Sequence, residues 1–127
     1  MSALSLRGLR ILVVEDNFVL ADALRYLLAG YDGVVTAIAP SVERALAAVE
    51  ADEVDVAVLD INLNGASVVP FAEHLSRAGT PFVFVTGYGD DPELLPEHLR
   101  GLPRLEKPVE AERLVNLLLE LAGRSPD

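Results

Sequence analysis

The chain has 127 residues, a length typical of one domain. Hydrophobic residues make up 51% of it and aromatic residues only 6%, which predicts a core of Leu, Val and Ala. The absence of cysteine excludes disulfides, thiolate metal sites and a cysteine nucleophile. Twenty acidic against ten basic residues give a formal net charge of −10, which opposes binding to nucleic acid phosphates. Because no apolar stretch is long enough for a membrane span and no secretory signal is present, we expect a cytoplasmic protein with no membrane partner.

Short apolar runs alternate along the chain with amphipathic stretches. Short runs rich in β-branched residues are typical of buried strands, and apolar residues three and four positions apart are typical of helices. The expected strands are residues 10–14, 33–39, 54–59, 81–85 and 102–105. The expected helices are residues 18–29, 42–49 with Ser41 as N-cap, 68–78, 91–99 and 110–122. The fourth of these helices is weak, because Pro92 and Pro96 interrupt it.

This alternation of five strands with five helices predicts a doubly wound α/β fold. Short connections of this kind are right-handed crossovers, so helices should cover both faces of one parallel sheet. No repeat, low-complexity tract or linker divides the chain. The expected domain covers residues 8–122, with flexible tails at residues 1–7 and 123–127.

Polar side chains stand where four of the predicted strands end. Glu15 and Asp16 follow the first strand, Asp60 the third, Thr86 the fourth and Lys107 the fifth. In parallel sheets, ligands bind beyond the carboxyl ends of the strands. Neighbouring strands lie about 4.8 Å apart, so these side chains should meet in one small cleft.

The formal charge of this cleft indicates a metal site. Glu15, Asp16 and Asp60 sum to −3, and Lys107 brings the cluster to −2. Two carboxylates 4 Å apart repel by about 4 kcal/mol at an effective dielectric constant of 20. A hard dication would neutralise the cleft, and oxygen-only ligands favour Mg²⁺. The alternative is a solvated acidic edge in which Asp16 is the N-cap of the first helix.

Four motifs in the chain are VVEDN, VAVLDINL, FVTG and EKP. In order and approximate spacing they resemble the receiver domain of bacterial two-component response regulators, and the resemblance covers nearly the whole chain. It implies a flavodoxin-like (βα)5 fold, a five-stranded parallel sheet with strand order 2-1-3-4-5. It also implies a signalling domain that accepts a phosphoryl group, not an enzyme that acts on other substrates.

The resemblance assigns a role to each residue of the cleft. Asp60 matches the phosphoryl-accepting aspartate, Asp16 the direct Mg²⁺ ligand, and Glu15 a carboxylate that acts through water. Asn62 matches the position whose backbone carbonyl binds the metal. Thr86 matches the residue whose hydroxyl follows the phosphoryl group, and Lys107 matches the residue whose ammonium contacts that group. The Lys107–Pro108 bond matches one that is usually cis in the family.

The resemblance also implies two kinds of protein partner. One is a histidine kinase or phosphotransferase, for which the surface of Val19, Asp22, Ala23 and Tyr26 is a candidate docking site. The other is a downstream target that binds the face of the fourth helix, fifth strand and fifth helix. Since the chain ends five residues after the last predicted helix, we expect a stand-alone receiver whose output is supplied by another protein.

Within receivers, PFVFVTGY at residues 81–88 is similar to the PFxFATG[G/Y] motif of a single-domain subfamily called FAT GUY. Members of that subfamily are linked to the bacterial general stress response. Val85 stands where alanine is usual. Two further departures from the receiver pattern are Asn64, where a proline is common, and Arg104, where most receivers have an aromatic switch residue. We expect the Arg104 guanidinium to stay in solvent or to pair with Glu106 or a carboxylate of residues 90–97, because its burial unpaired would cost several kcal/mol.

Two other functions fit part of the pattern. A phosphatase of the haloacid dehalogenase type also uses a strand-end aspartate and Mg²⁺, but it needs a second aspartate two residues later, where this chain has Asn62. The other alternative is a receiver-like module that is never phosphorylated. The presence of all three acidic residues, Glu15, Asp16 and Asp60, argues against it. His74 and His98 have no partner for a metal site or catalytic triad in the sequence pattern, and both are expected to be solvated.

Overall fold

Five apolar runs of the sequence form one parallel sheet in the computed structural model, which describes residues 4–87 and 95–123. The strands are β1 (Arg10–Val14), β2 (Val34–Ala39), β3 (Val56–Asp60), β6 (Phe82–Thr86) and β7 (Arg104–Glu106). Their order across the sheet is β2-β1-β3-β6-β7, with every neighbouring pair parallel. The predicted order 2-1-3-4-5 is therefore confirmed.

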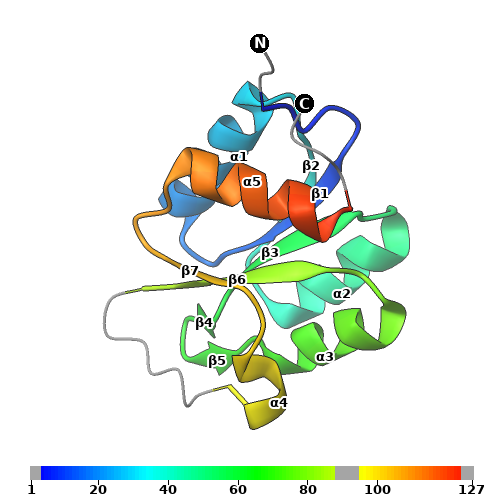
Figure 1. Cartoon of the computed structure of the whole chain (residues 1–127). Coiled ribbons are helices and arrows are strands. Elements are labelled where there is room, and N and C mark those ends of the chain that lie inside the picture. Colours follow the sequence, from blue (N-terminus) through cyan, green and yellow to red (C-terminus); the bar gives the residue numbers. More distant parts are fainter. Residues whose placement is uncertain (1–3, 88–94, 124–127) are drawn as a thin grey trace.

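Helices cover both faces of this sheet (Figure 1). On one face α1 (Phe18–Gly30) and α5 (Ala111–Leu121) pack against β-branched and leucine side chains of the strands. On the other face lie α2 (Val42–Ala51), α3 (Val69–Ala78) and the short α4 (Glu97–Arg100). No helix in the described part of the chain is long and apolar enough to cross a membrane.

Side-chain caps fix where two of the helices begin. The Asn17 side chain accepts a hydrogen bond from the Leu20 N–H and caps α1, and Ser41 caps α2 in the same way through the Arg44 N–H. The prediction for Ser41 is confirmed. The alternative in which Asp16 caps the first helix is wrong, because Asn17 holds that position.

The fourth helix differs most from its expected range. Residues 91–94 of the predicted helix lie outside the described residues, and α4 covers only Glu97–Arg100. Pro96 is its N-cap residue, as expected from a residue that has no N–H to donate and that disfavours helical geometry just before it. The following strand begins two residues later than predicted, at Arg104.

The packed structure begins earlier than the predicted boundary at residue 8. Leu6 is fully buried in the core beneath α1 and α5, and its N–H donates to the Tyr31 carbonyl at 2.6 Å. The expectation that residues 1–7 form a flexible tail is therefore wrong for Leu6. An apolar side chain of this size gains about 2 kcal/mol from such burial, which holds the segment on the domain.

A two-stranded antiparallel hairpin follows β3 and was not predicted. Its strands are β4 (Asn62–Leu63) and β5 (Ala66–Ser67). The two residues between them, Asn64 and Gly65, have φ values of 55° and 87°. Positive φ at both central positions is the geometry that tight hairpins prefer, and Asn-Gly is the dipeptide that adopts it most readily.

Candidate functional site

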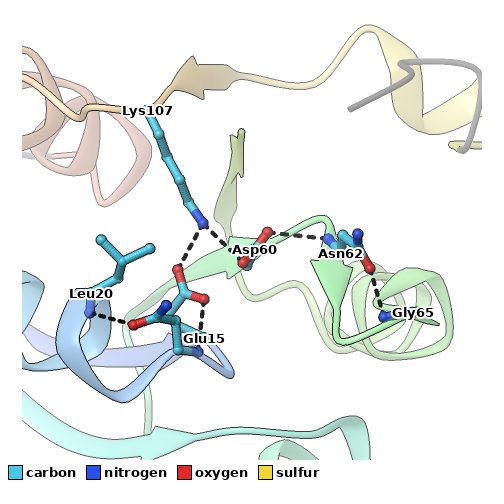
Figure 2. A network of polar contacts seen from close by, with 7 residues as sticks. Glu15, Leu20, Asp60, Asn62, Gly65 and Lys107 are labelled. Atoms are coloured by element: carbon cyan, nitrogen blue, oxygen red, sulfur yellow. Dashed lines mark hydrogen bonds and ion pairs between the residues drawn. The ribbon is translucent and has the colours of Figure 1, made fainter. Parts of the chain in front are cut away.

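Three of the polar residues predicted to meet, Glu15, Asp60 and Lys107, lie together at the carboxyl ends of the strands (Figure 2). Glu15 and Asp16 follow β1, Asp60 is the last residue of β3, and Lys107 follows β7. Each of the three acidic side chains has a carboxylate oxygen within 4.8 Å of one from each of the others. Glu15 and Asp60 are buried, with 3% and 4% of their surface exposed, whereas Asp16 is half-buried.

Lys107 joins two of these carboxylates. Its Nζ lies 3.0 Å from Glu15 Oε1 and 3.0 Å from Asp60 Oδ2. Figure 2 shows the side chain extending between the two acids. One ammonium thus partly compensates two buried carboxylates, and burial makes each of those charges costly without it.

Backbone N–H groups satisfy the remaining carboxylate oxygens. The Asn62 N–H donates to Asp60 Oδ1 at 3.1 Å, and the Asn17 N–H donates to Glu15 Oε2 at 3.2 Å. The Asn62 side chain in turn accepts from the Gly65 N–H at 2.9 Å, which ties it to the hairpin (Figure 2). The hairpin therefore orients the residue that contacts Asp60.

The surroundings shift the pKa of two groups. Burial raises the pKa of Glu15 from 4.5 to about 7, the nearby Asp60 adds to the rise, and the hydrogen bonds from Lys107 and Asn17 oppose it. Burial lowers the pKa of Lys107, but its hydrogen bonds with the two carboxylates outweigh that effect and leave the pKa raised. Lys107 therefore stays charged at neutral pH, while Glu15 resists ionisation.

The donor set fits a hard divalent cation. Three carboxylates with oxygens this close supply only oxygen ligands, and their charge of −3 when all three are ionised is not balanced by one ammonium. Lys107 contacts Glu15 and Asp60, which leaves Asp16 as the acid of the cluster without an ion pair among the described residues. A cation that binds beside Asp16 is therefore repelled less by the Lys107 ammonium than one that binds beside Glu15 or Asp60.

Thr86 and the Lys107–Pro108 bond complete this end of the sheet. Thr86 is the last residue of β6 and is half-buried, and its carbonyl accepts from the Lys107 N–H at 2.8 Å. The Lys107–Pro108 peptide bond is cis, as expected. Thr86 and Lys107 thus come from hydrogen-bonded neighbouring strands.

Three other polar residues do not join the cluster. His74 stacks on Phe71, with ring centroids 6.3 Å apart, and His98 Nε2 lies 3.6 Å from Glu73 Oε1 on α3. The His98 side chain is 63% exposed, in agreement with its expected solvation, and His74 is half-buried. The Arg104 side chain is exposed and has no carboxylate within 4.0 Å among the described residues, so of the two expected arrangements the structure has the one in solvent.

An apolar surface lies beside the cluster on α1. Phe18, Val19 and Tyr26 are 82%, 73% and 71% exposed. A cavity of about 210 Å³ opens between α1 and the loop that follows β7, with Leu20, Leu24 and Leu27 among its lining residues. Glu15 and Lys107 line the same cavity, so it adjoins the acidic cluster.

Two parts of the site were missed in the sequence. Asn17 was not predicted to cap α1 or to donate to Glu15, although Asn is among the preferred N-cap residues. The hairpin was also missed, although Asn64-Gly65 between apolar residues is a strong hairpin signal.

Comparisons with known proteins agree with this geometry. The sequence matches the family "Response regulator receiver domain" over residues 11–119. Among solved structures, it is similar to SdrG from Sphingomonas melonis, with 36% identity, 95% of this chain and 98% of that chain covered, and a TM-score of 0.77. A signal receiver domain of a modulated diguanylate cyclase from Desulfovibrio desulfuricans has 28% identity, coverage of 89% and 91%, and a TM-score of 0.77. A putative response regulator from Chloroflexus aurantiacus has the same fold, with 24% identity, coverage of 93% and 100%, and a TM-score of 0.80. Comparison with curated protein sequences finds no match.

Proposed function

This chain belongs to the receiver domain family of response regulators, and we propose that it accepts a phosphoryl group on Asp60 from a histidine kinase or phosphotransferase. The observation that carries the proposal is the environment of Asp60. It is a buried carboxylate at a strand end, with Lys107 at 3.0 Å and two other acids beside it. This arrangement supplies a nucleophile and the positive charge needed near the incoming group.

In the proposed reaction, an Asp60 carboxylate oxygen attacks the phosphorus atom of a phosphohistidine or of acetyl phosphate. The new bond joins phosphorus to the Asp60 oxygen and makes an acyl phosphate. The bond that breaks joins phosphorus to the histidine nitrogen or to the acetate oxygen. Asp16 and Asp60, with the backbone carbonyl of Asn62, would hold Mg²⁺, and Glu15 would contact it through water. Bound Mg²⁺ supplies electrostatic screening between the carboxylate and the anionic phosphoryl group. Lys107 would move from its carboxylate partners to the new phosphoryl oxygens.

Thr86 is the proposed link from phosphorylation to output. The phosphoryl group changes the site charge by about one unit and adds strong acceptor oxygens. A hydroxyl at the end of the strand beside Asp60 can donate to one of them. The exposed Arg104 is an always-charged group that does not repeat the inward movement of an aromatic residue. We therefore assign the conformational change to Thr86 and the loop from Gly87 to Asp91, of which residues 88–91 lie outside the described residues.

The phosphatase alternative fits this site less well. A haloacid dehalogenase mechanism needs a general acid two residues after the nucleophile. Asn62 stands there, and its side-chain oxygen is occupied by the Gly65 N–H. An amide also has no proton to transfer at neutral pH, so the position cannot protonate a leaving group.

The direct test is intact-mass measurement after incubation with acetyl phosphate and Mg²⁺. We expect the wild-type chain to gain one phosphoryl group and the Asp60→Asn variant to gain none, because an amide oxygen is a much weaker nucleophile. Asp52→Asn is a matched control, since it removes one acidic charge from the exposed residue that follows α2. Full labelling of the Asp60→Asn variant would contradict the assignment.

The exposed apolar surface on α1 is the proposed docking site for the phosphodonor. Val19 and Tyr26 are solvent-exposed on a protein of net charge −10, and the apolar cavity beside them adjoins the acidic cluster. Arg25 lies over the Tyr26 ring at 5.4 Å and pairs with Asp22 on the same surface.

We expect Tyr26→Ala to slow phosphotransfer from the cognate kinase about ten-fold, because an exposed aromatic anchor is removed. Labelling by acetyl phosphate should be unchanged, since a small donor needs no docking surface. Time courses with the two donors measure both rates. An unchanged rate of transfer from the kinase would contradict the docking assignment, whereas a fall of both rates together would mean that the change has damaged the fold or the acidic cluster.

The PFVFVTGY motif supports a narrower placement, in the FAT GUY subfamily and its link to stress signalling. Most of this motif forms β6, which carries Thr86 at its end. The proposed role is therefore a phosphorylated switch that signals by binding another protein.

A further inference from the structure

The turn of the β4–β5 hairpin is joined to Asp60 by two successive hydrogen bonds. The Gly65 N–H donates to the Asn62 side-chain oxygen at 2.9 Å, and the Asn62 N–H donates to Asp60 Oδ1 at 3.1 Å (Figure 2). Lys107 contacts the other oxygen, Asp60 Oδ2. The orientation of the Asp60 carboxylate therefore depends on Asn62, whose side chain is held by the turn.

The core holds the residues on either side of Asn62 but not Asn62 itself. Ile61 and Leu63 are buried in the core, whereas Asn62 is exposed. The two anchors fix the path of the chain, and they leave the orientation of the residue between them to its own contacts. The hairpin strands are only two residues long, so the ladder between them adds little restraint. The hydrogen bond from Gly65 is thus an important restraint on Asn62.

Gly65 makes this hydrogen bond from a conformation that favours glycine. Its φ is 87°, in the left-handed region that residues with a side chain rarely adopt. A Cβ atom added to Gly65 would meet no other atom within 4 Å, so the need for glycine is conformational and not steric. Because so short a hairpin has few other contacts, alanine would relieve its strain by changing the turn. The N–H at position 65 would then no longer point at Asn62.

We propose that Gly65 is a positioning residue for the reaction at Asp60. Its left-handed conformation directs its N–H to Asn62, and Asn62 in turn holds Asp60 Oδ1. Asn62 also supplies the backbone carbonyl that is proposed to bind Mg²⁺, so the turn orients two of the proposed ligands before the cation arrives. Hydrogen bonds that orient metal ligands contribute to metal affinity in this way. The inference deepens the proposed function and rests on it for the identity of the cation.

The test compares Gly65→Ala with Gly79→Ala in the full chain. Gly79 also has a positive φ, 77°, and an added Cβ would also meet nothing within 4 Å, but it follows the C-terminal end of α3, before β6 begins. Both changes therefore introduce similar strain, and only one lies beside the acidic cluster. In an amide NMR titration with Mg²⁺, we expect Gly65→Ala to raise the Kd about five-fold, the effect of one lost hydrogen bond, and Gly79→Ala to leave it unchanged. Gly65→Asn should recover part of the affinity, because asparagine adopts positive φ more readily than alanine.

Amide hydrogen exchange in EDTA tests the positioning without the cation. We expect the N–H groups of Asn62 and of residue 65 to exchange about five-fold faster in Gly65→Ala than in the wild type. Exchange of the buried β3 amides reports global stability and should change equally in the two glycine variants. An equal rise of the Kd in both variants, or unchanged exchange at Asn62 in Gly65→Ala, would overturn the proposal. A wild-type chain that binds no Mg²⁺ would contradict the proposed cation instead, and the exchange rate at Asn62 would still decide whether Gly65 positions it.

Discussion

In the Lys107→Met variant, we expect the free energy of unfolding at pH 8 to fall by about 2–3 kcal/mol. Methionine keeps the apolar stem but removes the ammonium that lies 3.0 Å from both Glu15 and Asp60. Two buried carboxylates would then face each other without compensation, and breaking a buried ion pair on one side typically costs about 3–5 kcal/mol. The lower figure applies because the Lys107 side chain is 24% exposed. Urea unfolding in EDTA measures the difference.

The loss should be smaller at pH 5 than at pH 8. Burial raises the pKa of Glu15 from 4.5 to about 7, so between these values the folded chain holds more protons than the unfolded chain. The contribution of Glu15 to stability therefore falls as pH rises through this interval. Because Lys107 lowers the pKa of Glu15, its removal extends that penalty to higher pH. Adding Glu15→Gln to Lys107→Met should restore part of the stability at pH 8, and equal losses at both pH values would contradict the assigned charges.

We expect the Asp16→Asn variant to be more stable than the wild type without Mg²⁺ and less stable than the wild type with Mg²⁺. In EDTA it loses one of three carboxylates within 4.8 Å of one another, so we expect it to be more stable than the wild type by about 0.5–1 kcal/mol. At a hundred times the Kd, a metal that binds only the folded state adds about 2.7 kcal/mol to the wild type. The variant lacks one of the proposed direct ligands and should gain little. Thermal unfolding with and without Mg²⁺ measures both terms.

Glu15→Gln is the comparison for this experiment. Glu15 already accepts hydrogen bonds from Lys107 and the Asn17 N–H, so its oxygens are less available to a cation than those of Asp16. We expect Glu15→Gln to keep more of the stabilisation by Mg²⁺ than Asp16→Asn keeps. Equal stabilisation of Asp16→Asn and wild type would place the metal elsewhere.

The sheet could be predicted because its strands are short apolar runs and most of them are followed by polar residues. A strand that is buried on both faces, such as β3, must consist of apolar residues, and in β3 only the last residue, Asp60, is charged. Features of the fold that depend on single contacts could not be predicted from the sequence pattern. Leu6 looks like tail in the sequence, yet it fills a space beneath α1, and the short hairpin after Asp60 has too few residues for a periodic pattern.

The clustering of the acidic side chains followed from topology, because parallel strands present their carboxyl ends at one edge. The partners of each oxygen did not follow from it. That Lys107 joins Glu15 to Asp60, and that Asn62 turns its amide toward Gly65, depend on side-chain rotamers and on a turn that the strand pattern does not encode. The exposed position of Arg104 could be expected from the cost of burying a guanidinium.

The most direct measurement for the central claim is reductive mapping of the phosphorylated residue. After incubation with acetyl phosphate and Mg²⁺, borohydride reduces an aspartyl phosphate to homoserine, and peptide mass spectrometry identifies the converted position. Our account predicts homoserine at position 60, no homoserine at Asp16, and no reduction of Glu15 to the corresponding five-carbon alcohol. Conversion at another carboxylate, or a chain that acquires no phosphoryl group under these conditions, would contradict it.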